Sequence, residues 1–193
     1  MRDNIINTYN NYLMHFKPND PSSVGWTDKE NQYTRFDALF RIGIQDNDKV
    51  LDYGCGLGHL NEYISDKGFS DVDYCGIDIN PSYIYLAKVI YPDKTFHEGE
   101  MDIVSADDNF DYIIGSGVFS VGVTDEYVYN SIKMAYNHAK KGVAFNFLKK
   151  ESNLEPLKTY DKDEMLELLS SIGDVIVLDG YLGDEDFTIL IKK

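Results

Sequence analysis

An acidic residue and three alternating glycines follow a short apolar run near residue 50 of this chain. The segment is Val50-Leu51-Asp52-Tyr53-Gly54-Cys55-Gly56-Leu57-Gly58. Glycine tolerates positive φ and lets backbone N–H groups approach a ligand without an intervening Cβ. A helix beginning at about Leu57 would direct the positive end of its dipole toward the same ligand. The pattern therefore predicts a strand that ends in a nucleotide-binding turn.

A second carboxylate, Asp78, closes the next predicted strand about 20 residues beyond the glycine turn. A carboxylate in that place can hold a ribose diol, and it disfavours the 2′-phosphate of NADP. The dinucleotide fingerprint G-x-G-x-x-G would require glycine at position 59, where this chain has His59. The two motifs thus favour an adenine nucleoside ligand and argue against NAD and NADP.

Alternating strand and helix patterns surround these motifs, as in a doubly wound α/β sheet. Asn80-Pro81 and Thr124 have the residue types of helix starts, and Asp161 to Glu164 resembles a capping box. A glycine-containing connection from Gly180 to Asp186 is predicted to join the last two strands as a hairpin. The predicted strands cover residues 49–53, 73–79, 94–97, 111–115, 142–148, 175–178 and 187–191.

In this order and spacing, the segments resemble the class I S-adenosylmethionine (SAM)-dependent methyltransferases. Leu51 to Gly58 looks like the first motif of that family, and Asp78 falls where its ribose-binding acid lies. Phe96 to Met101 looks like its adenine-contacting segment, with Glu100 where Asp is more usual, and Phe110 to Phe119 resembles its fourth strand and following loop. The resemblance implies a Rossmann-like, doubly wound, seven-stranded sheet, mostly parallel with a C-terminal antiparallel hairpin.

The resemblance also implies SAM as the cofactor and S-adenosylhomocysteine (SAH) as its product. The carboxyl ends of parallel strands meet at one edge of a sheet, so the motifs should converge on one pocket. Further segments, including Gly25 to Phe36, look like a subfamily of stand-alone bacterial methyltransferases without an assigned substrate. The residues expected to bind the cofactor are Trp26, Gln32, Arg35, Asp52, Gly54, Cys55, Gly56, Leu57, Gly58, Asp78, Ile79, Glu100, Met101 and Ser116.

The segment before the sheet is expected to cover the pocket. We predict a helical lid over residues 1–45 and a SAM-binding domain over residues 46–193, which together form one globular domain. Gln32 and Arg35 lie three residues apart and therefore share one helix face. The Arg35 guanidinium would suit bidentate capture of the cofactor's carboxylate. The alternative is an exposed face on a helix that packs through its apolar side.

A catalytic residue is not obligatory, because the sulfonium already activates the methyl group and proximity alone supplies roughly 7 to 11 kcal/mol. If the acceptor requires a base, His15 in the predicted lid is the candidate, with a surface location as the alternative. No His, Cys and carboxylate cluster has metal-ligand spacing, which predicts a metal-independent enzyme. Residues that could line the acceptor pocket from the later strand ends are Asn146, Tyr181, Asp184 and Asp186.

The composition restricts the partners. Lys and Arg number 18 against 33 Asp and Glu, and the formal net charge of -15 opposes the phosphate neutralisation on which nucleic-acid binding depends. The two cysteines do not form a disulfide framework, and no apolar run approaches the ~20 residues of a membrane helix. We therefore expect a cytoplasmic protein that binds neither nucleic acid nor membrane.

A small-molecule acceptor is favoured by the chain's size and acidity, with a protein acceptor second. The alternative function is a non-catalytic SAM-binding regulatory or scaffolding module. Tight cofactor binding without methylation of any acceptor would distinguish that module from an enzyme. The sequence makes no prediction of the oligomeric state.

Overall fold

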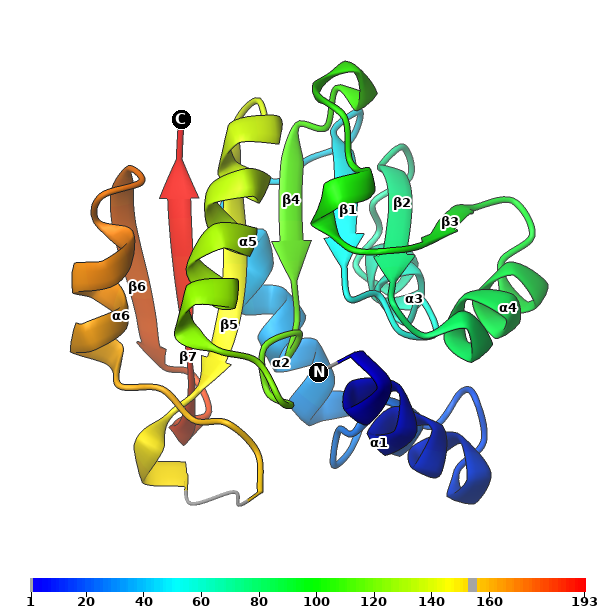
Figure 1. The fold of residues 1–193 in the computed structure, drawn as a ribbon. Helices are drawn as coiled ribbons and strands as arrows, with labels where there is room; N and C mark the ends of the chain where they lie inside the picture. The colour runs from blue at the N-terminus through cyan, green and yellow to red at the C-terminus, as the bar shows by residue number, and fades with distance from the viewer. Residues whose placement is uncertain (1, 153–155) are drawn as a thin grey trace.

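The computed structural model describes residues 2–152 and 156–193, which fold around one seven-stranded sheet (Figure 1). The strand order is β3-β2-β1-β4-β5-β7-β6, and only β7 runs antiparallel to its neighbours β5 and β6. This arrangement confirms the predicted Rossmann-like sheet. The strands are β1 (Lys49–Tyr53), β2 (Asp73–Asp78), β3 (Thr95–Glu98), β4 (Tyr112–Gly115), β5 (Gly142–Leu148), β6 (Asp174–Gly180) and β7 (Gly183–Lys192).

Helices cover both faces of the sheet, with α5 on one side and α2 on the other (Figure 1). The parallel strands are consequently buried on both faces. Leu51 and Ile113 pack toward α5 and α6, whereas Val50 and Ile114 pack toward α2, α3 and α4. The helices are α1 (Arg2–His15), α2 (Lys29–Phe40), α3 (Leu60–Asp66), α4 (Pro81–Ile90), α5 (Asp125–His138) and α6 (Lys162–Leu169).

Three helix starts predicted from N-cap residues are confirmed. Asn80 accepts a hydrogen bond from the Ser82 amide ahead of α4, and Thr124 accepts one from the Tyr127 amide ahead of α5. Asp161 accepts two amide hydrogen bonds at the start of α6. Each cap satisfies amide groups that the first helical turn leaves without partners.

Two predicted boundaries were wrong by three residues or more. The helix after the glycine turn begins at Leu60 rather than at about Leu57, because Gly56 and Gly58 have φ values of 53° and 78°, which no right-handed helix admits. The β6 to β7 connection is also shorter than predicted, since β7 already begins at Gly183. Its first residues are polar and exposed, yet backbone pairing with β5 and β6 makes them a strand without an apolar pattern.

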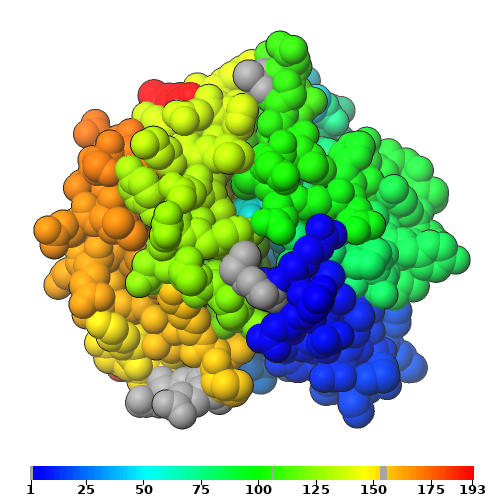
Figure 2. Space-filling view, viewed as in Figure 1, coloured from blue at the N-terminus to red at the C-terminus, as the bar shows by residue number. Residues whose placement is uncertain are grey.

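The segment before β1 has two parts that pack differently. In α2, Phe36, Leu39 and Phe40 are buried in the core against the sheet. Helix α1 buries none of its residues, but an ion pair of 2.9 Å joins Arg2 to Glu98. Figure 2 shows α1, in dark blue, lying against the green part of the chain. No helix in the described ranges has both the length and the apolar character of a membrane span.

Candidate functional site

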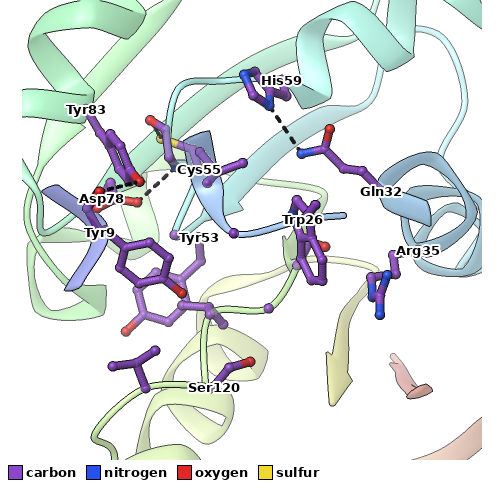
Figure 3. Close-up of a pocket in the computed structure, with 18 of the residues that line it drawn as sticks. Tyr9, Trp26, Gln32, Arg35, Tyr53, Cys55, His59, Asp78, Tyr83 and Ser120 are labelled. Carbon is purple, nitrogen blue, oxygen red and sulfur yellow. Dashed lines mark hydrogen bonds between the residues drawn. The ribbon is translucent and has the colours of Figure 1, made fainter. Parts of the chain in front are cut away.

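A cavity of about 280 Å³ lies at the carboxyl ends of the central strands. Its walls come from α1, the segment around Trp26, α2, the ends of β1 and β2, the loop after β4 and the start of β7. Figure 3 shows Asp78, Tyr9 and Tyr83 on one side of it and Trp26, Gln32 and Arg35 on the other. The predicted residues that line it are Trp26, Gln32, Arg35, Asp52, Gly54, Cys55, Gly56, Asp78, Ile79 and Ser116.

Asp78 is held in place by two backbone amides. Its Oδ2 accepts a hydrogen bond of 2.9 Å from the Gly56 amide, and its Oδ1 accepts one of 2.8 Å from the Asn80 amide. Burial raises the pKa of the carboxyl to about 6. Each carboxylate oxygen can accept a further hydrogen bond, so Asp78 has the acceptor capacity that two adjacent hydroxyl groups require. The carboxylate therefore fits a ribose diol.

The glycine turn leaves no room for side chains. A Cβ on Gly54, whose φ is 74°, would lie 2.6 Å from Cγ2 of Val118, and a Cβ on Gly56 would lie 3.0 Å from Cγ1 of Val24. Both glycines line the cavity. The close approach of Val118 and Val24 shows that this stretch of backbone is confined, and the structure thus explains the glycines at these two positions.

Asp52 places a buried carboxyl group in the same cavity. Its side chain is only 5 % exposed, and Oδ2 accepts a hydrogen bond of 2.9 Å from the Tyr74 hydroxyl. Burial raises the pKa of the carboxyl to about 7, because water no longer stabilises its charged form. A cationic ligand beside Asp52 would compensate for that lost hydration.

Arg35 does not occupy the role predicted for it. Its Nε and Nη2 each donate a hydrogen bond of 2.6 Å to Asp186, which makes a bidentate buried ion pair. Nη1 donates to the backbone and side-chain oxygens of Asn31, and Trp26 lies against the guanidinium at 4.3 Å. The Nε and Nη2 donors of the guanidinium are therefore already bound to Asp186 and are not available to the carboxylate of SAM. The alternative of an exposed helix face is wrong too, since Arg35 is 2 % exposed.

Gln32 joins α2 to the glycine turn through His59. Gln32 Nε2 donates to His59 Nδ1 at 3.2 Å, and His59 Nε2 donates to the Pro18 carbonyl at 2.7 Å. Burial lowers the pKa of His59, which favours the neutral ring that this bonding pattern needs. In the sequence, His59 argues only against NAD. In the structure, it also links Gln32 to the Pro18 carbonyl at the cavity wall.

Several predicted residues do not line the cavity. Leu57 is fully buried in the core, Met101 is buried in the cluster that includes the apolar residues of α5, and Gly58 faces Phe96. Glu100 Oε2 accepts a hydrogen bond of 3.0 Å from the hydroxyl of Tyr127, which itself lines the cavity. Position 100 thus reaches the cavity wall through a tyrosine rather than directly.

The candidate base His15 is exposed at the end of α1. Its Nδ1 lies 2.7 Å from the Asn11 carbonyl, and its side chain is not part of the cavity wall. The geometry therefore gives His15 no contact with a ligand in the cavity. The alternative of a surface position holds.

The four residues suggested for an acceptor pocket do not line the cavity, and three of them make structural contacts instead. Asn146 Oδ1 accepts a hydrogen bond of 2.8 Å from the Gly117 amide, and the Tyr181 hydroxyl pairs with Thr188 at 2.8 Å. Asp186 is engaged by Arg35, and Asp184 does not line the cavity. Glu185, which lies between Asp184 and Asp186, does line the cavity. The residues named from the sequence are those on either side of it, and side chains alternate between the two faces along a strand.

Tyrosine side chains form much of the wall and were also missed. Tyr9 and Tyr12 are three residues apart on α1, a spacing that indicates a shared helix face and could have identified them. Burial and the nearby Asp78 raise the pKa of Tyr9, so its hydroxyl stays protonated. The tyrosines that line the cavity are Tyr9, Tyr12, Tyr53, Tyr83 and Tyr127.

Comparison with known proteins gives similarities that extend along most of the chain. A methyltransferase domain family model matches residues 44–181. The chain is 26% identical over 167 residues to the protein named putative methyltransferase Rv1506c of Mycobacterium tuberculosis, which covers 79% of this chain and 97% of that protein.

Two solved structures share the fold at low sequence identity. The PH0226 protein of Pyrococcus horikoshii superposes with a TM-score of 0.74 at 16% identity, over 94% of this chain and 98% of that one. Magnesium protoporphyrin IX methyltransferase of Synechocystis, solved with bound SAM, superposes with a TM-score of 0.68 at 14% identity, over 98% of this chain and 94% of that one.

Proposed function

We propose, since this chain belongs to the methyltransferase domain family and is a class I SAM-dependent methyltransferase, that it methylates a small molecule. The observation that carries this proposal is the covered cavity. Ile5, Tyr9 and Tyr12 of α1 and the indole of Trp26 all form part of its wall. A small molecule can be enclosed under such a cover, and its reaction is then shielded from water. A folded protein acceptor would require the cover to move away.

Asp78 and the glycine turn are proposed to hold SAM. The Asp78 carboxylate has acceptor capacity for the two ribose hydroxyls, and its own position is fixed by the Gly56 and Asn80 amides. Asp52 is proposed to stabilise positive charge on the bound cofactor, because a buried carboxylate without a cationic partner gains most from one. SAM itself supplies a methyl group activated by a sulfonium.

The chain's contribution to the reaction is then enclosure and positioning. Trp26 is fixed between Arg35 and Gly117, where a Cβ on Gly117 would lie 2.7 Å from Cζ2 of the indole. The Gln32 to His59 hydrogen bond fixes α2 to the glycine turn. Rigid walls of this kind restrict the approach of an acceptor, and such restriction is a large source of rate enhancement.

The test is isothermal titration of the protein with SAM, SAH and NAD in parallel, followed by assay of SAH release with small-molecule and protein acceptors. SAM and SAH should bind and NAD should not. SAH release with small molecules supports the proposal, and methylation of proteins alone would overturn it. Tight SAM binding without any SAH release would identify a non-catalytic SAM-binding module instead.

A further inference from the structure

On the side of the cavity opposite Asp78, where Arg35 lies (Figure 3), β5 and β7 each contribute a residue to the wall. Because β7 is antiparallel to β5, its first residues lie at the same sheet edge as the carboxyl ends of the parallel strands, and Asp186 pairs with Leu148. Leu148 and Glu185 both line the cavity there, respectively two and three strands beyond β1, which ends at the glycine turn. If SAM occupies the Asp78 end, as the proposed function states, this end receives the acceptor.

The arginine at this end has no donor left for an anionic ligand. Arg35 Nε and one N–H of Nη2 each donate a hydrogen bond to Asp186, and Nη1 donates to two oxygens of Asn31. The remaining Nη2 donor points to Glu185 Oε2 at 3.5 Å. Arg35 is the one Lys or Arg side chain in the described cavity wall, and its charge is already balanced by the bidentate pair with Asp186.

Glu185, by contrast, retains acceptor capacity. Its Oε2 accepts a 3.3 Å hydrogen bond from Asn31 Nδ2 and the long contact from Arg35, while Oε1 takes no hydrogen bond from the described residues. Its side chain is 51% exposed. After Arg35 and Asp186 compensate each other, the Glu185 carboxylate is the negative charge left among the described wall residues at this end.

Apolar side chains lie near Glu185 beside its polar neighbours Asn31 and Arg35. The Trp26 indole lies against Arg35, which contacts Glu185. Leu148 pairs with Asp186. Leu157 and Val121 line the same cavity. A carboxylate with acceptor capacity beside an indole and a leucine matches a ligand that has an apolar body and one cationic or hydrogen-donating group. An anionic ligand would meet Glu185 without a compensating donor.

We propose that the methyl acceptor is an amine-bearing apolar small molecule and that Glu185 binds its ammonium group. This inference rests on the proposed function, because it assigns the acceptor of the same site. Carboxylates pair with ammonium groups through charge-assisted hydrogen bonds. Glu185 is thus a specificity-determining residue, and Trp26 and Leu148 contact the apolar body.

The test measures binding of three matched probes to the SAH-loaded protein at pH 7.5 by titration calorimetry: 2-phenylethylamine, 2-phenylethanol and 3-phenylpropionate. The amine should bind about fivefold tighter than the alcohol, a modest factor because Glu185 is half exposed and its charge is screened. The carboxylate probe should bind weakest of the three.

Two variants locate the effect. Glu185→Gln should abolish the preference for the amine and leave binding of the alcohol unchanged, since the side chain keeps its size and loses its charge. Asp184→Asn removes the same charge one residue away, outside the cavity wall, and should keep the preference. Both should bind SAH as the unaltered protein does.

Three outcomes would overturn the inference: equal or absent binding of the three probes, tighter binding of 3-phenylpropionate, or an amine preference that survives Glu185→Gln. If SAH still binds in these cases, the proposed function stands. Failure of the unaltered protein to bind SAH would instead overturn the proposed function, and this inference with it.

Discussion

Replacing Asp52 with asparagine should stabilise the ligand-free protein at neutral and alkaline pH. The Asp52 side chain is 5 % exposed, and the hydroxyl of Tyr74 is its hydrogen-bond donor. Burial raises the pKa of this carboxyl from 3.8 to about 7. The folded protein therefore loses stability by holding the charge out of water, whereas asparagine has nearly the same shape and no charge.

The magnitude follows from the pKa shift. A rise from 3.8 to about 7 is about three pKa units, and each unit corresponds to about 1.4 kcal/mol. Because the folded pKa lies above the unfolded one, the unfolded chain releases its proton first, and stability falls as pH rises between about 4 and 7. Asp52→Asn lacks this loss. Its unfolding free energy should exceed that of the unaltered protein by up to about 4 kcal/mol at pH 8. The difference should shrink to about 2 kcal/mol at pH 5.5 and approach zero near pH 4.

Urea unfolding of both proteins without ligand, at pH 4, 5.5, 7 and 8, measures that difference. Asp73→Asn, which removes an exposed carboxylate at the start of β2, is the control and should change stability by less than about 0.5 kcal/mol at every pH. SAM should bind Asp52→Asn more weakly, since the variant has lost a negative charge in the cavity. An unfolding free-energy difference that does not vary with pH, or a less stable variant at pH 8, would refute the reasoning.

Three further substitutions have defined outcomes. Asp78→Ala should raise the Kd for SAM at least several-fold in calorimetry, because the ribose hydroxyls lose their acceptor; unchanged affinity would remove Asp78 from the site. Arg35→Ala should lower the unfolding free energy by about 3 to 5 kcal/mol in urea titrations, because Asp186 is left buried and unpaired. Unaltered stability with weakened SAM binding would instead assign Arg35 to the cofactor's carboxylate. Gly117→Ala should destabilise the protein by about 1 kcal/mol or more, because its φ of 67° strains alanine and the new Cβ meets Trp26. The emission of Trp26, the one tryptophan, should shift accordingly, and an unshifted spectrum would contradict the packing described.

Features that depend on neighbouring residues were predictable. The Asn80 cap and the proline after it act within one helical turn, and the structure has them as the sequence indicated. The glycine turn and Asp78 were also predictable, because positive φ and an acid at a strand end are expressed in residue type and spacing. The strand edge then brings these motifs together, since parallel strands end on the same side.

Features that depend on distant pairing were not predictable. Arg35 and Asp186 lie 151 residues apart, and nothing near either residue indicates the other. From the sequence alone, Arg35 could bind the carboxylate of the cofactor. In the fold, Arg35 binds the carboxylate of Asp186 from β7 instead. The start of β7 is a similar case, because backbone hydrogen bonds to β5 form a strand there from residues without an apolar pattern.

The sequence by itself therefore determined the class of fold and the two motifs at the proposed binding end, because glycine conformation, capping and strand patterns are local properties. The cofactor followed from the resemblance of those motifs to the class I SAM-dependent methyltransferases. Only the tertiary structure decided which charges compensate each other. It pairs Arg35 with Asp186, leaves Glu185 facing the cavity and buries Asp52, since burial and ion pairing are set by whichever residues the folded chain places within a few ångströms.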